Sequence, residues 1–200
     1  MNRIAAFAVL LLLSFGPSAQ AAAIVGKPAP PIQLGDLEGK KVTLDAYKGK
    51  FVVLEWVNFE CPFVGKHYGS GNMQALQKRY TEEDVVWLSI CSSAPGKQGY
   101  MTVSEAKDLV EEQGASPSRF LLDPKGVAGK RYGAKTTPHM FVIDPRGIVV
   151  YNGAIDDKPS AKRADIETAK NYLVAALDAS MAGKRVEIAA SQPYGCSVKY

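Results

Sequence analysis

Short apolar runs alternate along this chain with stretches in which apolar residues recur at helical spacing. The near-continuous apolar runs at residues 51–57 and 85–90 predict two central strands. Between them, residues 62–80 predict a helix, whose inward positions we expect to be Val64, Tyr68, Met73, Leu76 and Tyr80. Glycines at positions 65, 69 and 71 weaken its first turns, so we expect this helix to be kinked or to begin late.

The rest of the chain continues this alternation of strands and helices. Thr102 followed by Glu105 forms a capping box and predicts a helix that continues to residue 113. A turn with proline second and glycine fourth, at residues 144–147, predicts a hairpin. The other expected elements are a hairpin around residues 35–39, a short strand at 120–122, a helical turn at 127–132 and a final helix at 166–181. This order predicts one α/β domain.

The beginning of the chain is typical of a secretory signal. Arg3 supplies the positive start, residues 5–15 the apolar core, and Ala19-Gln20-Ala21 a small-residue cleavage site. The apolar core is too short to span a bilayer and no later run is longer, so we expect no membrane span after cleavage. We therefore predict a signal peptide over residues 1–21, a domain over residues 22–182, a tail over residues 183–200, and a periplasmic or secreted protein.

Composition limits both the partners of the protein and the role of its cysteines. A formal net charge of +4 without a basic run argues against a nucleic-acid partner. Three cysteines in 200 residues are too few for a disulfide-stapled scaffold, and their odd number leaves at least one unpaired within the chain. Chemistry therefore explains these cysteines better than structure does.

Cys61 stands where an apolar strand gives way to a helix. Pro62 suits the first helical position, and the unpaired backbone N–H groups at that helix end lower the pKa of a thiol. Lys66 and His67 follow about one turn later and would add positive potential if they face the sulfur. The alternative is a buried cysteine that fills space in the core. We favour a reactive thiolate.

A strand-to-helix cysteine followed much later by Thr137-Pro138 and an apolar strand resembles the thioredoxin fold. The resemblance covers roughly residues 26–182 and implies a central mixed β-sheet flanked by helices, with a β-hairpin at its N-terminus. It also implies that the peptide before Pro138 is cis and that its loop packs beside Cys61, presenting backbone to an extended substrate. We expect His139 near the site, the alternative being a hydrogen-bonded strand histidine.

The chain departs from two branches of that fold. Thioredoxins carry a second cysteine three residues after the first, where this chain has Val64. Peroxiredoxins carry Thr or Ser three residues before the cysteine, where this chain has Asn58, whose amide can still donate a hydrogen bond. Peroxiredoxins also place an arginine near the thiolate, for which Arg119, Arg131 and Arg146 are candidates. The segments that resemble exported redoxins of the alkyl hydroperoxide reductase and thiol-specific antioxidant (AhpC/TSA) type are residues 60–64, residues 70–77, Thr137-Pro138-His139 and residues 195–200.

Two further cysteines could partner Cys61. Cys196 lies about 14 residues past the last predicted helix, and such a tail reaches about 45 Å when extended, so contact within the chain or with a neighbouring copy is open. Gly195 would allow a close approach. We favour Cys196 as a resolving thiol, the alternative being a tail cysteine in a small apolar patch. Cys91 ends an apolar strand and is more typical of buried packing, but it remains an alternative thiol.

These residues predict an exported thiol-dependent oxidoreductase, in which Cys61 attacks a peroxide or a protein disulfide and Cys196 resolves the product. An external thiol reductant, such as a thioredoxin-like donor, would regenerate the dithiol. No sequence feature suggests a flavin, a nicotinamide, a haem or a resident metal. Two alternatives stay open: a copper-delivery module that uses Cys61, Cys196 and His139 or His67, and a redox-inert binding domain.

Overall fold

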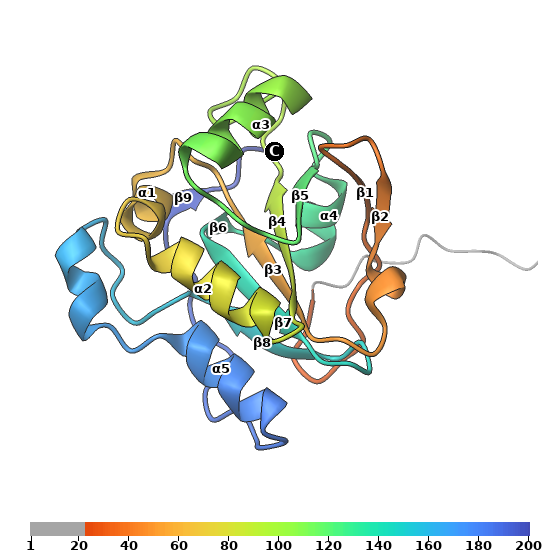
Figure 1. Cartoon of the computed structure of the whole chain (residues 1–200), viewed down its shortest axis with the longest axis vertical. Coiled ribbons are helices and arrows are strands. Elements are labelled where there is room, and N and C mark those ends of the chain that lie inside the picture. The colour runs from red at the N-terminus through yellow and green to blue at the C-terminus, as the bar shows by residue number, and fades with distance from the viewer. Residues whose placement is uncertain (1–22) are drawn as a thin grey trace, which may run out of the picture.

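The computed structural model describes residues 23–200, and the predicted signal peptide lies outside them. These residues form a seven-stranded sheet in the order β2-β1-β5-β4-β3-β7-β8 (Figure 1). Strands β3, β4 and β5 run parallel and the other pairings are antiparallel, so the sheet is mixed, as predicted. The strands are β1 (Gln33–Asp36), β2 (Lys41–Thr43), β3 (Val52–Trp56), β4 (Val86–Cys91), β5 (Arg119–Leu122), β7 (His139–Ile143) and β8 (Val149–Gly153).

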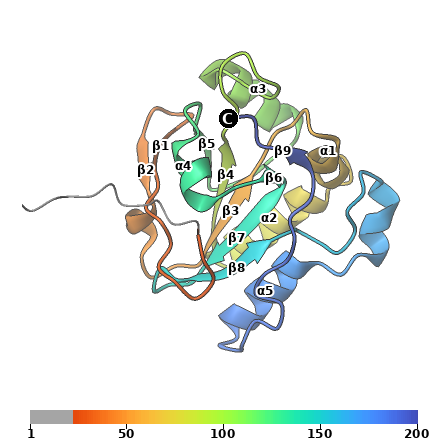
Figure 2. The ribbon, with the colours of Figure 1, turned by 180° about the vertical axis from the view of Figure 1, so that it is seen from behind.

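Helices cover both faces of this sheet. They are α1 (Pro62–Tyr68), α2 (Asn72–Glu82), α3 (Val103–Glu112), α4 (Val127–Tyr132) and α5 (Tyr172–Met181). Val53 belongs to an apolar cluster with side chains of α1, α2, α3 and α5, whereas Leu54 and Trp56 belong to a second cluster with side chains of α4. Figure 2 shows α4 in front of the sheet. Because side chains of β3 enter a core on each face, the strand is buried along its whole length. Within residues 23–200, no helix has both the length and the apolar character needed to cross a membrane.

The helix predicted at residues 62–80 is divided in two. α1 ends at Tyr68, and α2 begins at Asn72 after Gly71, whose φ of 76° is a left-handed conformation that glycine adopts readily. The predicted kink is therefore a complete break. The side chains predicted to point inward are nevertheless all buried.

The last predicted helix begins later than its apolar spacing suggested. α5 starts at Tyr172, where the Asn171 side chain accepts a hydrogen bond from the Val174 N–H and caps the helix. Arg163–Thr168 form a separate 3-10 helix, and Ala169 after it is extended, with φ of −75° and ψ of 135°. The capping side chain, rather than the apolar pattern, sets this boundary.

The remaining predicted elements are present. The N-terminal hairpin is β1–β2, the capping box of Thr102 and Glu105 begins α3, and β7 and β8 form the second hairpin. The short strand β5 and the helical turn α4 also lie where the sequence indicated them.

After α5 the chain returns along the sheet edge, first beside β8 and then beside a short loop strand (Figure 2). Ser191 donates a backbone hydrogen bond to the Asn152 carbonyl at 3.2 Å. Further on, β9 (Cys196–Ser197) pairs antiparallel with β6 (Thr136–Thr137). The sequence pattern did not predict these two strands, because each is only two residues long. Their pairing brings the C-terminal tail to the loop that precedes β7.

Candidate functional site

Cys61 is the N-cap residue of α1. Its N–H donates to the Asn58 carbonyl at 3.0 Å, which closes the turn after β3, and its own carbonyl accepts from the Gly65 N–H at 2.9 Å. Pro62 occupies the first helical position, where its missing N–H costs nothing. Cys61 is only 1 % exposed, so the thiol lies beneath the surface.

The loop before β7 packs directly against this thiol. The Thr137–Pro138 peptide is cis, as the resemblance implied, and Cys61 Sγ donates to the Thr137 carbonyl oxygen at 3.0 Å. The Thr137 hydroxyl is buried and has no hydrogen-bond partner within residues 23–200 while Cys61 is a thiol. A hydroxyl in this position is a donor available to the sulfur once the sulfur is ionised.

Cys196 reaches the site through the pairing of β9 with β6, in which it lies opposite Thr137. The preceding residue, Gly195, has φ of 131°, and a Cβ atom there would overlap the Thr137 carbonyl oxygen. Only glycine lets the tail approach this closely. The side chain and the backbone N–H of Cys196 are placed so that both can stabilise the ionised Cys61 sulfur as hydrogen-bond donors. The two sulfurs that the sequence analysis favoured therefore lie together within one chain.

The pKa values of these two thiols are shifted in opposite directions. Burial raises the pKa of Cys61, but hydrogen bonds from Thr137, from Cys196 and from the Val64 backbone outweigh it, so the net shift is downward. Burial, the hydrogen bond to Cys61 and the charge of its thiolate raise the pKa of Cys196 to about 11. Of the two thiols, Cys61 is therefore the one that ionises first, and its thiolate would accept from the protonated thiol of Cys196.

Asn58 has a structural position beside the site rather than on the sulfur. Its side-chain oxygen accepts from the Glu60 N–H at 2.9 Å, and its amide donates to the Gln98 carbonyl at 3.3 Å. These bonds fix the turn that carries Cys61. The donor that the sequence suggested for Asn58 is therefore directed at a loop carbonyl.

Lys66 and His67 do not supply positive potential to the sulfur, as their spacing had suggested they might. Lys66 is 1 % exposed, and its ammonium binds Asp156 and the hydroxyl of Tyr194. Burial lowers the pKa of His67 to about 4, so this ring is neutral at pH 7. No sequence pattern pointed to Asp156, whereas Tyr194 stands two residues before Cys196 and could have been suspected on that ground.

The three candidate arginines have partners in other parts of the fold. Arg119 forms an ion pair with Asp36 at 3.4 Å, and Arg146 binds its neighbour Asp144. Arg131 donates to the Pro31 carbonyl at 2.8 Å. The hydrogen bonds that lower the Cys61 pKa come from neutral groups.

His139 is a structural histidine, the alternative that the sequence analysis left open. Its Nδ1 accepts from the Lys135 N–H at 3.2 Å, so Nε2 carries the proton and donates to Asn152 Oδ1 at 2.8 Å. Burial lowers the pKa of the ring to about 4. Both nitrogens are therefore occupied, and neither is open to a copper ion. Within the described part of the chain, no three His, Cys, Asp or Glu side chains are grouped so that they could hold a metal.

Cys91, the alternative thiol, lies at the end of β4 with different surroundings. It is 2 % exposed and donates to the Gly99 carbonyl at 3.3 Å. Burial raises its pKa, despite hydrogen bonds with Ser93. These contacts fit the packing role that its position on a strand suggested.

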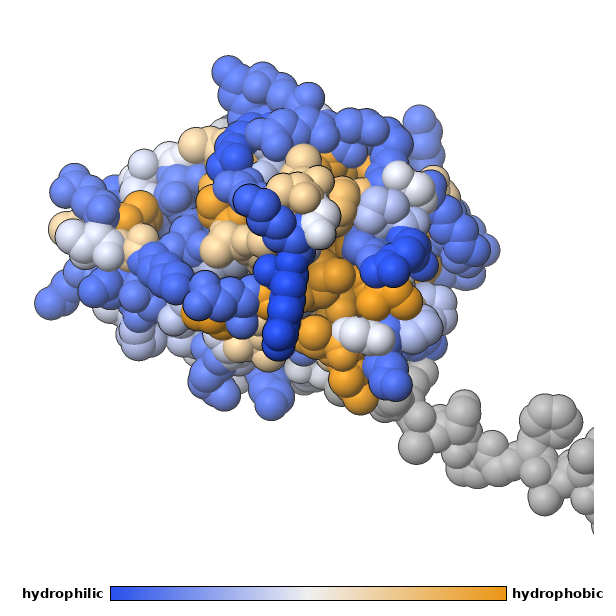
Figure 3. Space-filling model, turned by 90° about the horizontal axis from the view of Figure 1, so that it is seen from below, coloured by the Kyte–Doolittle hydropathy of each residue, from blue (hydrophilic) through white to orange (hydrophobic). Residues whose placement is uncertain are grey.

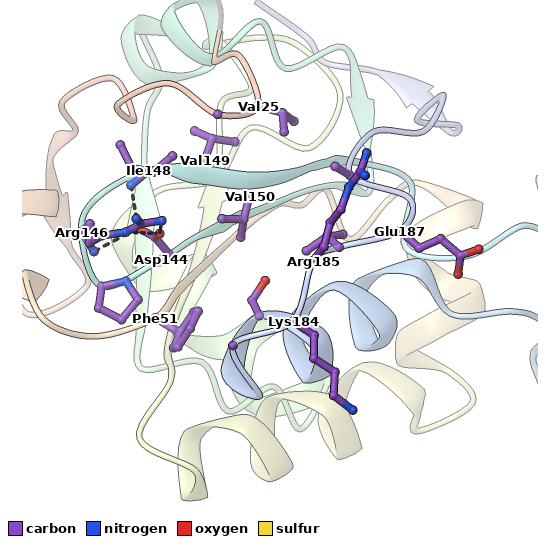
Figure 4. Close-up of a pocket in the computed structure, with 16 residues that line it drawn as sticks. Val25, Phe51, Asp144, Arg146, Ile148, Val149, Val150, Lys184, Arg185 and Glu187 are labelled. Atoms are coloured by element: carbon purple, nitrogen blue, oxygen red, sulfur yellow. Dashed lines mark hydrogen bonds and ion pairs between the residues drawn. The ribbon is translucent and has the colours of Figure 1, made fainter.

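A separate hollow lies far along the sheet from this site. It is a groove of about 640 Å³ at the opposite end of β3, between Phe51, Val149, Val150 and the cationic residues Lys184 and Arg185 (Figure 4). Figure 3 views the molecule from that end and shows hydrophobic surface exposed there. No cysteine lines the groove. A smaller hollow of about 260 Å³ borders residues 58–60, immediately before Cys61.

Comparisons with known proteins agree with this geometry. The chain is 29% identical over 126 residues to the thiol-disulfide oxidoreductase ResA of Bacillus thuringiensis. The aligned region covers 63% of this chain and 67% of that protein. It is 24% identical over 145 residues to the thioredoxin-like protein YneN of Bacillus subtilis, covering 71% of this chain and 79% of YneN. An uncharacterized conserved protein from Geobacillus kaustophilus has a crystal structure that superposes with a TM-score of 0.72 at 27% identity, over 88% of this chain and 92% of its own.

The sequence model of one family matches the larger part of the chain. The match with the AhpC/TSA family covers residues 25–152, and it includes Cys61 and the cis peptide before Pro138. The relatives above are thioredoxin-like proteins and thiol-disulfide oxidoreductases. On the combined ground of this match, the mixed sheet and the thiol beside the cis-proline loop, the protein belongs to the AhpC/TSA family of thioredoxin-like redoxins.

Proposed function

We propose that this protein is an exported thiol–disulfide oxidoreductase with Cys61 as the nucleophile and Cys196 as the resolving thiol. The observation that carries the proposal is the placement of Cys196 beside the Cys61 sulfur by the pairing of β9 with β6. The pKa shifts of the two thiols, downward on Cys61 and upward to about 11 on Cys196, support it. An attacking thiol must be ionised, whereas a resolving thiol has to stay protonated until its turn. We therefore assign each sulfur one step.

In the first step, the Cys61 thiolate attacks one sulfur of a substrate disulfide. A Cys61–substrate bond forms, the substrate S–S bond breaks, and the other substrate sulfur leaves as a thiolate. In the second step, Cys196 loses its proton and attacks the Cys61 sulfur. This forms the Cys61–Cys196 disulfide and releases the second substrate thiolate, so the substrate is reduced by two electrons and the protein is oxidised by two.

The first step prepares the second through electrostatics. The hydrogen bond to Cys61 and the charge of its thiolate are among the causes that raise the pKa of Cys196, after burial. Once Cys61 is in a mixed disulfide it carries no charge, so that part of the shift disappears. Cys196 then becomes a thiolate more readily, at the stage when its attack is needed. An external dithiol, such as a thioredoxin-like donor, returns the protein to its reduced form.

A peroxide is the second candidate substrate, and the 1 % exposure of Cys61 favours it, because a small oxidant reaches a covered sulfur more easily than a protein does. The thiolate attacks the O–O bond, leaving a sulfenic acid on Cys61 and releasing the alcohol or water. Cys196 then condenses with the sulfenic acid, forming the same disulfide and one water. Either substrate class therefore yields the same oxidised protein.

The cellular location is part of the proposal. Residues 1–21 have the pattern of a cleaved secretory signal, and release after Ala21 would place the protein in the periplasm or outside the cell. A dithiol enzyme there works in an oxidising compartment and depends on a reductant delivered to it. Its partners would then be exported proteins with disulfides, or peroxides, together with that reductant.

Mass spectrometry of peptides from the reduced mature protein tests the proposal. One portion receives one equivalent of a model disulfide and another receives one equivalent of hydrogen peroxide, and both are sampled within seconds. We expect the Cys61–Cys196 disulfide to form in the first portion. A disulfide only in the second portion would make the protein a peroxidase, and no change of Cys61 in either would support the redox-inert alternative.

A further inference from the structure

A buried group of polar side chains joins the C-terminal tail to α1, the helix that begins after Cys61. Lys66 lies on α1, and its ammonium binds Asp156 Oδ2 at 3.0 Å and the Lys158 carbonyl at 2.9 Å. The side chains of Lys66 and Asp156 are 0 % and 3 % exposed. The tail contributes Tyr194, whose hydroxyl donates to Asp156 Oδ1 at 2.5 Å.

The hydrogen bonds around the Tyr194 hydroxyl form a complete set. The ammonium of Lys66 donates to it at 3.3 Å. His67 Nδ1 accepts from the Asn72 amide at 2.9 Å, so its Nε2 carries the proton and donates to the same hydroxyl at 3.3 Å. With its own proton on Asp156, the Tyr194 oxygen gives one hydrogen bond and accepts two. The ring also contacts Phe63 on α1, with centroids 5.9 Å apart.

We call the group formed by Lys66, His67, Asp156 and Tyr194 the polar anchor of the tail. Lys66, His67 and Asp156 belong to the domain, and the Tyr194 hydroxyl is the tail's contribution to the group. If the tail lifts, these groups become accessible to water, which solvates charges well. An apolar anchor would instead expose hydrophobic surface on opening. A polar anchor therefore holds the tail closed without making its release prohibitively costly.

The tail must move for Cys61 to react with anything large. Cys61 is 1 % exposed, and Cys196, two residues after Tyr194, contacts its sulfur with both its side chain and its backbone. The segment that holds the resolving thiol in place is thus also part of the cover over the nucleophile.

We propose that Tyr194 is a positioning residue that latches the C-terminal tail onto α1. Its hydroxyl controls how often the tail opens, and so sets both the access of reagents to Cys61 and the time Cys196 spends beside it. The second effect rests on the proposed function, whereas the first does not. A closed tail that opens rarely gives fast disulfide closure and slow attack by outside reagents.

The test is Tyr194→Phe in the full mature protein, because this change keeps the ring and leaves the Lys66–Asp156 pair intact. Tyr80→Phe is the matched control: the Tyr80 hydroxyl also donates to a carboxylate, Asp178 at 2.9 Å, but it joins α2 to α5. Two rates are measured by peptide mapping. One is alkylation of reduced Cys61 by iodoacetamide as a function of pH. The other is conversion of the Cys61 mixed disulfide into the Cys61–Cys196 disulfide, timed from the appearance of the mixed disulfide so that the first attack, which also depends on opening, does not enter.

We expect Tyr194→Phe to raise the high-pH plateau of Cys61 alkylation about tenfold, since a hydrogen bond to a charged group is worth that order in an opening equilibrium. Disulfide closure should slow by a smaller factor, because a tail that was nearly always closed remains closed for much of the time. Tyr80→Phe should change neither rate. An unchanged plateau in Tyr194→Phe would overturn the latch.

Hydrogen exchange separates a latch from a general stabilising role. The Val198 N–H, bonded to the Lys135 carbonyl at 3.0 Å, should exchange faster in Tyr194→Phe while amides of β3 keep their protection. If the β3 amides also lose protection, Tyr194 acts on the whole fold and the latch is rejected. If the unmodified protein forms no Cys61–Cys196 disulfide, the proposed function fails, but the alkylation plateau still decides the latch.

Discussion

The carboxyl ends of β3 and β4 place two cysteines in similar positions with different chemistry. β3 and β4 are parallel neighbours, with Trp56 paired to Ile90. Cys91 is the last residue of β4, and Cys61 follows β3 after a short turn. Cys61 is 1 % exposed and Cys91 is 2 % exposed, and both belong to the same apolar cluster. The pKa of Cys61 is nevertheless lowered, whereas the pKa of Cys91 is raised.

The difference lies in the donors that surround each sulfur. The Cys91 thiol donates a hydrogen bond to the Gly99 carbonyl, and burial is the main cause of its raised pKa. Cys61 also lies against a carbonyl, but the Thr137 hydroxyl, Cys196 and the Val64 backbone can donate to its ionised form. Burial alone makes a thiol inert, and hydrogen-bond donors brought in from distant segments reverse that effect.

Removing each sulfur in turn should give the largest contrast. Cys61→Ser should reduce turnover of a model disulfide by about a hundredfold or more, because the nucleophile is lost. Cys91→Ala should leave the rate near that of the unmodified protein and cost about 1 kcal/mol of stability through lost packing. Steady-state turnover and chemical denaturation of both variants measure these effects.

Comparable losses of turnover in the two variants would end the distinction between the two cysteines. It would also revive Cys91 as the alternative resolving thiol. Circular dichroism of Cys91→Ala shows whether such a loss comes instead from unfolding.

The sequence predicted where the cysteines lie in the fold better than it predicted which groups surround each sulfur. Apolar runs ending at a cysteine, the proline at position 62 and the Thr137-Pro138 pair were enough to predict the thioredoxin-like sheet and to single out Cys61. The hairpins and most helices followed from spacing and turn chemistry, whereas the order of the seven strands came from the structure. What spacing could not give is which distant groups touch the sulfur.

Three features illustrate this limit. The pairing of β9 with β6 involves two residues from each segment, which is too short for any periodicity. His139 looked like a site residue in the sequence, but its two ring nitrogens are used to hold Lys135 and Asn152. Lys66 looked like a source of positive potential for Cys61, but a partner far along the chain, Asp156, draws its ammonium away. Each outcome depends on long-range packing.

Gly195→Ala should shift Cys61 towards the behaviour of Cys91. A Cβ atom at residue 195 overlaps the Thr137 carbonyl, and the φ of 131° there disfavours any other residue. We expect the tail to lose its pairing with β6, so that the Cys61–Cys196 disulfide forms at least about tenfold more slowly, a loss that corresponds to about 1.4 kcal/mol. Stopped-flow mixing with a model disulfide, followed by acid quench and peptide mapping, measures this rate.

Gly183→Ala is a suitable control for that change. Gly183 also has a positive φ, of 67°, but a Cβ atom there has no neighbour within 4 Å. It should carry the backbone strain without the overlap at Thr137. If both variants slow closure equally, general strain in the C-terminal segment is the cause, and the close approach at Gly195 has no special role.

Thr137→Val tests the smallest contribution, that of a single hydroxyl to the contrast between the thiols. A thiol reacts as its thiolate, so its alkylation rate rises as the pH passes its pKa from below. With a lowered pKa, Cys61 should react at a lower pH than Cys91, whose pKa is raised. Valine keeps the branched shape and the backbone carbonyl but removes the donor, so the Cys61 profile should move to higher pH while that of Cys91 stays in place. At neutral pH this should slow Cys61 alkylation by up to about tenfold, the order of one hydrogen bond to a charged group.

The high-pH plateau of Cys61 alkylation should not change in Thr137→Val, because the hydroxyl acts on ionisation and not on access. A shift in the plateau without a shift in the midpoint would mean that Thr137 only holds the tail, and the donors to Cys61 would then reduce to Cys196 and the Val64 backbone.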